Sequence, residues 1–169
     1  MSSGIFIRFQ IHPMYASFLQ GYYNCYAPVF SFPREDFDQL DLAYEFKRRL
    51  KRIPQTYKPE KIAQDDFLIE IPNSKDRPAS SFSFMSSINK ETFVKTIKIV
   101  MHTILRDRIN KNRSMGLEIK DSIRDAMDYY GIPQDHFESI RKEYQRWQWR
   151  AYKVKKPRKK QEKNIYQHD

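Results

Sequence analysis

Residues 118–140, EIKDSIRDAMDYYGIPQDHFESI, carry the clearest structural pattern in the chain. Apolar side chains recur in the first half at spacings of three and four, which predicts a helix with an inward face made of Ile119, Ile123, Ala126, Met127 and Tyr130. Gly131 follows at once and suits the left-handed backbone conformation that ends many helices. Pro133 is typical of the first residue of a helix. The stretch therefore predicts two helices joined by a short turn, with Phe137 and Ile140 facing inward in the second.

This pattern resembles a helix-turn-helix. In that motif a glycine follows the first helix, and spaced apolar residues hold the second helix at roughly a right angle. The residues at matching spacings are Ala126, Tyr130, Gly131, Ile132, Phe137 and Ile140. Met127 departs from the motif, which prefers alanine there, and its bulk is expected to open the crossing angle. The resemblance implies that the second helix binds DNA, and an ordinary helical hairpin is the alternative.

A helix-turn-helix places the opening turns of its second helix in the major groove. The residues there that commonly contact bases or phosphates are Gln134, His136, Ser139 and Lys142. Asp135 and Glu138 lie in the same turns, and their carboxylates repel phosphates. The pattern therefore favours contact through the later, basic part of the helix, where the candidates are Arg146, Arg150 and Lys153.

The second helix also carries a long apolar repeat, formed by Phe137, Ile140, Tyr144, Trp147, Ala151 and Val154. The repeat forms an apolar seam of about two and a half heptads, and Tyr144 and Trp147 on it are expected to pack against the body of the protein. Trp149 falls off that face and is expected to be exposed. An exposed tryptophan beside arginines suits stacking on a nucleobase or anchoring of a partner protein.

The positive charge is concentrated at the C-terminal end. The net charge is +10, and the last 29 residues hold 11 Lys and Arg against 3 Asp and Glu. A basic arm on a near-neutral body is typical of proteins that meet nucleic acid, although a solubilising tail has the same composition. The arm adds five candidate phosphate contacts: Lys155, Lys156, Arg158, Lys159 and Lys160. Pro157 blocks continuation of the helix, so residues 155–169 are predicted to form a basic disordered tail.

Residues 1–111 predict an α+β body with a small mixed sheet. Strands are expected at 5–11, 28–32, 67–71 and 81–85, and helices from Pro13, over 33–53 and from Asn89, with 110–116 ending the last. The inward face of the 33–53 helix is assigned to Phe37, Leu40, Tyr44 and Leu50. Residues 112–154 are expected to form an all-helical second part that contains the helix-turn-helix-like hairpin.

Several kinds of catalytic site are excluded by the sequence. No glycine-rich phosphate-binding string occurs, and the lone Cys25 permits neither an intrachain disulfide nor a cysteine-based zinc site. The four histidines are not at metal-ligand spacing, and no nucleophile, base and orienting group stand together. We therefore expect no catalytic residue, no metal and no cofactor.

Two functions remain from the sequence. The first is a non-catalytic nucleic-acid-binding protein, a DNA-binding regulator or accessory factor of a phage or mobile element. The second is a structural or assembly subunit, such as a virion or complex component, whose basic tail contacts nucleic acid or an acidic partner. The 137–154 helix also offers a surface for a protein partner, and a dimer is one option.

The expected compartment follows from cysteine use and from the apolar runs. These runs are too short for a signal peptide or a membrane span, so the cytoplasm is expected, or the nucleus for a eukaryotic or viral protein.

Overall fold

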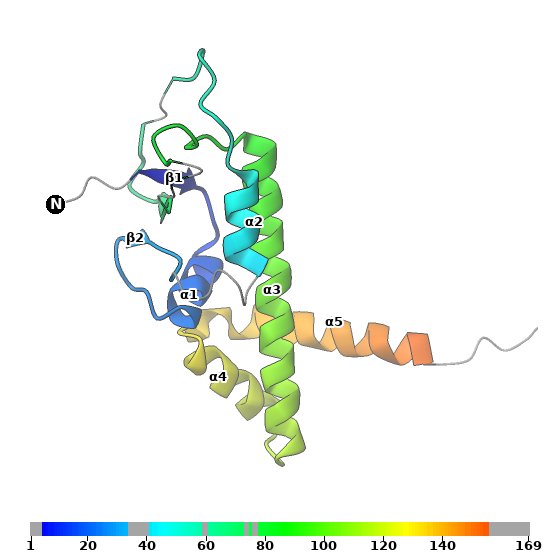
Figure 1. Ribbon diagram of the computed structural model, residues 1–169. Coiled ribbons are helices and arrows are strands. Elements are labelled where there is room, and N and C mark those ends of the chain that lie inside the picture. The colour runs from blue at the N-terminus through cyan, green and yellow to red at the C-terminus, as the bar shows by residue number, and fades with distance from the viewer. Residues whose placement is uncertain (1–4, 34–40, 59–60, 73–74, 76–77, 156–169) are drawn as a thin grey trace, which may run out of the picture.

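The computed structural model describes residues 5–33, 41–58, 61–72, 75 and 78–155 (Figure 1). Within these residues the chain forms one small sheet and five α-helices, which confirms the predicted α+β class with a small mixed sheet. The predicted tail contacts Lys156, Arg158, Lys159 and Lys160 lie outside the described residues, as does the rest of the 156–169 segment.

The sheet has three strands, β1 (Phe6–Phe9), β2 (Val29–Phe30) and β3 (Phe67–Glu70), in the order β1-β3-β2. β3 pairs with β1 antiparallel and with β2 parallel, so the sheet is mixed. The fourth predicted strand, 81–85, is wrong. That segment forms turns and a single antiparallel bridge between Phe84 and Lys51.

The long helix α3 (Ser87–Ser114) connects the two parts of the fold. Its N-terminal half packs beside α2 (Asp41–Arg49), and it also packs against α4 (Ile119–Tyr129) (Figure 1). Side chains four residues apart form its buried stripe: Phe93, Ile97, Met101, Leu105 and Ile109. α3 ends at Ser114, inside the 110–116 segment that was predicted to end it, although it continues past Asn110. The predicted division of the chain at 111 thus falls inside a helix.

The inward face of α2 also differs from the prediction. Tyr44 is 58% exposed, whereas Leu42, Ala43 and Phe46 are buried. Phe46 belongs to a group of tilted aromatic rings with Phe9 and Phe93, at centroid distances of 5.5 to 6.2 Å. The sheet and α3 therefore select a different side of α2. Two other predicted inward residues, Phe37 and Leu40, lie outside the described residues.

The predicted hairpin is present as two helices. α4 ends at Tyr129, and Gly131 has a φ of 65°, which confirms its predicted left-handed conformation. The 3-10 turn η2 (Gln134–His136) then precedes α5 (Phe137–Lys155). Pro133 therefore comes before a 3-10 turn rather than opening an α-helix.

The helix α1 (Pro13–Tyr22) packs against this turn. Tyr22 stacks on Tyr130 at 5.8 Å between ring centroids, and Phe18 meets the edge of the same ring. A Cβ atom on Gly21 would lie 2.0 Å from the carbonyl oxygen of Tyr130. The backbones of α1 and the turn are therefore in direct contact, and glycine is what allows it.

A polar network joins the C-terminal end of α3 to α4. The buried Asn112 side chain donates to Asp125 at 2.6 Å, and Arg108 donates to the same carboxylate oxygen at 2.9 Å. The Arg108 guanidinium also lies 3.6 Å from the centre of the Tyr129 ring. The hydrogen bond from Asn112 is the main cause that lowers the pKa of Asp125.

We expect Asn112→Ala to lower the free energy of unfolding by about 1 kcal/mol at pH 7, because a part-buried hydrogen bond to a charged, partly solvated carboxylate is lost. The lowered pKa of Asp125 means that its stabilising contribution is present above the unfolded-state pKa and is lost as the pH falls through the folded-state value. The difference between wild type and variant in urea unfolding should therefore shrink below about pH 4. Ser114→Ala is the control, because it removes an exposed hydroxyl that donates a hydrogen bond to the backbone carbonyl of Lys111. If wild type and Asn112→Ala differ in free energy of unfolding by the same amount at pH 7 and at pH 3, the ionised Asp125 carboxylate is not the partner that stabilises the fold.

Candidate nucleic-acid interface

The inner face of α5 fixes the helix against α3. Ile140 and Tyr144 are buried, and the Tyr144 hydroxyl donates to the side-chain oxygen of Asn110 at 2.7 Å. The Arg106 guanidinium lies 4.8 Å from the centre of the half-buried Trp147 ring. These contacts determine which side of α5 faces away from the body.

The C-terminal part of α5 leaves the body. Figure 1 shows α5 crossing α3 and its C-terminal half extending clear of the other helices and strands. Tyr144 and Trp147 pack against the core as predicted, whereas Val154, at the end of the apolar repeat, is 86% exposed. The repeat continues in the sequence, but within the described residues no element lies there to cover it.

The side of α5 opposite its buried face is basic. Its exposed cations follow one another at spacings of three and four: Lys142, Arg146, Arg150 and Lys153. We call these residues, together with Trp149, the basic face. Trp149 is 56% exposed, which confirms its predicted exposure. The Lys153 ammonium lies 4.6 Å from the centre of the indole ring.

The cations of the basic face are largely uncompensated. Arg146 reaches Glu143 at 3.4 Å, in an exposed pair one turn apart along α5. Within the described part of the chain, Lys142, Arg150 and Lys153 form no ion pair. Exposed ion pairs such as Arg146–Glu143 are weak and typically contribute less than about 1 kcal/mol. The face therefore presents four positive charges to an incoming anion.

The turn between α4 and α5 has the opposite character. An open hollow of about 550 Å³ lies there, lined by Arg124, Asp128, Gln134, Asp135, Phe137 and Glu138. Three of these six residues are carboxylates, and the Gln134 amide donates to Asp128 at 2.6 Å. Phosphates are repelled by such a surface.

The remaining predicted contacts are divided between these surfaces. Ser139 is exposed on the same side of α5 as the basic face, and Lys155 is the last described residue of the helix. His136 is half-buried in η2, with its ring 5.3 Å from that of His12, the residue that caps α1. The structure thus brings Ser139, Lys142, Arg146, Arg150 and Lys153 onto one side of α5. It leaves Gln134 and His136 in the turn.

The meeting of His12 and His136 was not predictable from spacing, because 124 positions separate them in the sequence. Among the described residues, no group of three or more His, Cys, Asp and Glu side chains is placed to hold a metal ion. None of the described helices combines the length and the apolar content that crossing a membrane requires.

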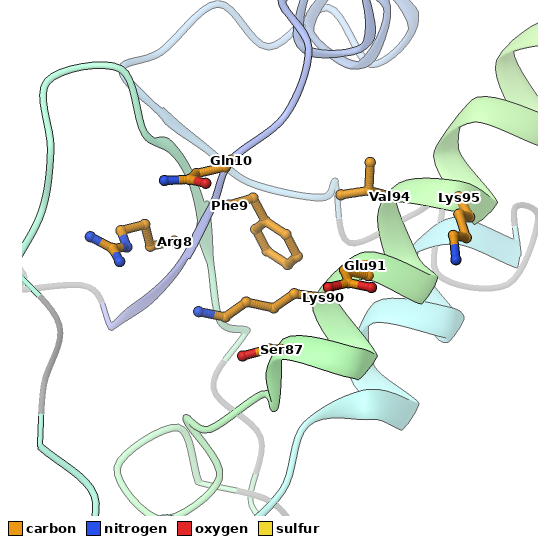
Figure 2. Close-up of a pocket in the computed structure, with 8 residues that line it drawn as sticks. All are labelled: Arg8, Phe9, Gln10, Ser87, Lys90, Glu91, Val94 and Lys95. Atoms are coloured by element: carbon orange, nitrogen blue, oxygen red, sulfur yellow. The ribbon is translucent and has the colours of Figure 1, made fainter.

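A second hollow lies between β1 and the N-terminal end of α3 and has a volume of about 460 Å³. Figure 2 shows Arg8, Phe9 and Gln10 on one side of it and residues of α3 on the other. Arg8 is engaged in an ion pair with Asp66 at 3.2 Å. The lining residues from α3 are Ser87, Lys90, Glu91, Val94 and Lys95. The eight lining residues include no imidazole or thiol.

A smaller hollow of about 90 Å³ lies between α3 and α5 and includes His102 and Glu143 in its lining. The pKa of His102 is lowered, mainly because burial disfavours the charged imidazolium. The nearby Glu143 carboxylate opposes this shift without reversing it. This hollow adds no positive charge of its own beyond Arg106 and Arg150.

The basic face is therefore the strongest candidate for a binding surface. Comparison of the chain with protein-family models, with curated proteins and with solved structures finds no match.

Proposed function

We propose that this chain is a non-catalytic nucleic-acid-binding protein, a DNA-binding regulator or accessory factor, and that the basic face of α5 makes the contact. The observation that carries the proposal is the row of four exposed cations along α5, on the side of the helix away from its buried Ile140 and Tyr144. Lysine and arginine that neutralise phosphates release condensed counterions, and this release drives most non-specific nucleic-acid binding.

The dimensions and the charge of α5 support the same proposal. From Lys142 to Lys153 the helix rises about 16 Å, at about 1.5 Å per residue. The major groove of B-DNA is about 12 Å wide and admits an α-helix. The acidic turn before α5 favours an approach through the second half of the helix rather than through its first turns.

The test is a binding titration with a 20-base-pair duplex of DNA, and with one of RNA, at several salt concentrations. If each cation of the basic face contacts one phosphate, log K should fall with log salt at a slope of about −3.6 or steeper on DNA. Absence of binding at low salt, or binding that does not weaken with salt, would contradict the proposal.

The alternative proposal is an assembly subunit, favoured by the apolar surface on the projecting end of α5. Val154, Tyr152 and Trp149 are all more than half exposed there, which is typical of a surface that another protein covers. Selection of preferred sites from random duplexes separates the two proposals. Enrichment of a sequence favours the regulator, whereas no enrichment over background at moderate salt favours the assembly subunit.

A further inference from the structure

We propose that the basic face is built for unpaired bases, and that Trp149 stacks on a base of single-stranded nucleic acid while the neighbouring cations hold its phosphates. This inference rests on the proposed function and names the ligand class of the same surface. It starts from the position of Trp149, which lies among the four cations rather than beside them.

The surroundings of the indole ring suit a base. An open hollow of about 410 Å³ is lined by Trp149 together with Lys142, Gln145, Arg146 and Arg150. Lys142, Gln145 and Arg146 lie up to two turns before Trp149 along α5, and Arg150 directly follows it. Lys153 lies one turn after Trp149 and approaches the ring at 4.6 Å. The ring thus has an ammonium on the C-terminal side and an open, cation-lined hollow on the N-terminal side.

The hollow is of adequate size and polarity. Its volume falls within the range of about 300–1,000 Å³ that is usual for small-molecule sites. Gln145 contributes an amide that both donates and accepts hydrogen bonds, as the edge of a base requires. The arginine and lysine side chains supply the charge for the attached phosphates.

The Trp149 indole is expected to distinguish unpaired bases from bases that are paired in a duplex. In a duplex the faces of the bases are covered by their stacked neighbours, and only the base edges reach the grooves. A tryptophan that projects from a helix therefore stacks most readily on an unpaired base, because insertion into a duplex must first unstack two base pairs. Phosphate contacts alone gain nothing from a large exposed aromatic ring, so the indole favours single strands over duplexes.

The chain has two tryptophans, which permits a direct readout. In Trp147→Phe, Trp149 is the only tryptophan, and stacking on a base should quench its fluorescence. We expect quenching on titration with a 20-nucleotide oligothymidylate and little on titration with a 20-base-pair duplex. Comparing the quenching by a 20-nucleotide oligouridylate with that by the oligothymidylate shows whether single-stranded RNA or single-stranded DNA binds better.

The affinity test uses Trp149→Ala in the otherwise unchanged chain. Loss of one stacked base should weaken binding of the single strand about 5- to 150-fold and leave duplex binding nearly unchanged. Trp149→Phe, which keeps an aromatic face, should retain most of the affinity. Tyr44→Ala, at a similarly exposed aromatic residue on α2, is the matched control and should bind like wild type.

Three outcomes separate the inference from the function on which it rests. Quenching by single strands with a selective loss in Trp149→Ala supports the inference. Salt-dependent duplex binding without quenching, and with no selective loss in that variant, overturns the inference and leaves the proposed function standing. Absence of binding to any nucleic acid, with binding to polyglutamate instead, overturns both.

Discussion

Replacing the four cations of the basic face by alanine is expected to weaken binding to duplex DNA about a thousand-fold at 0.1 M salt. Each phosphate contact changes the slope of log K against log salt by about 0.9, so four contacts change it by about 3.6. The slope of the quadruple variant should therefore be flatter by that amount. The residues replaced are Lys142, Arg146, Arg150 and Lys153, all exposed, so the fold should be unaffected.

A matched control separates position from net charge. Alanine at four exposed lysines outside α5, Lys95, Lys98, Lys111 and Lys120, removes the same number of charges from the chain. If attraction is a property of the whole molecule, both variants should lose affinity equally. We expect the control to keep a slope within about one unit of wild type, which corresponds to roughly one phosphate contact. Equal losses in the two variants would contradict a localised site.

Gly21→Ala is expected to lower the free energy of unfolding by about 1–3 kcal/mol, as overpacking in a close contact does. In an isolated helix the same change would stabilise by about 0.5–1 kcal/mol, so the sign reports the tertiary contact. The added Cβ would lie 2.0 Å from the carbonyl oxygen of Tyr130 and 2.5 Å from its carbonyl carbon. These are backbone atoms, so relief requires α1 and the turn to move apart.

Urea unfolding measures this effect, with Gln20→Ala as the control in the same helix. The control should change stability by less than about 0.5 kcal/mol, as half-exposed surface positions usually do. If Gly21→Ala proves as stable as wild type or more stable, α1 does not pack against the turn in solution.

The hairpin was predictable because its signals are local. The spacing of Ile123, Ala126 and Met127 determines one face of α4, and all three are buried as expected. Gly131 was placed correctly because few residues other than glycine adopt its φ of 65°. The cations of α5 were predictable for the same reason, since spacings of three and four place them on one side of a helix.

Contacts between distant parts of the sequence were not predictable. Nothing near Gly21 indicates that its α-carbon faces the backbone of Tyr130. Asn112 suggested the end of a helix, yet its hydrogen bond to Asp125 keeps it buried within α3. The face of α2 depends on where the sheet and α3 lie, so Tyr44 was assigned to the wrong side.

The sequence also could not show how much of α5 the rest of the fold covers. The apolar repeat of α5 continues to Val154, which is 86% exposed, and Figure 1 shows the C-terminal half of the helix extending clear of the other elements. A repeat shows which side of a helix is apolar and not how far its partner extends. Periodicity alone would therefore place the end of α5 in the core, whereas the structure shows that Val154 is exposed.

Mapping the bound nucleic acid on the protein by backbone amide NMR tests the role of α5 most directly. On titration with DNA at low salt, signals of residues 142–153 are expected to shift most, and the indole N–H signal of Trp149 should shift with them on single strands. Shifts concentrated instead in residues 124–138, or around the hollow between β1 and α3, would show that nucleic acid binds elsewhere and would contradict the assignment of the site to α5.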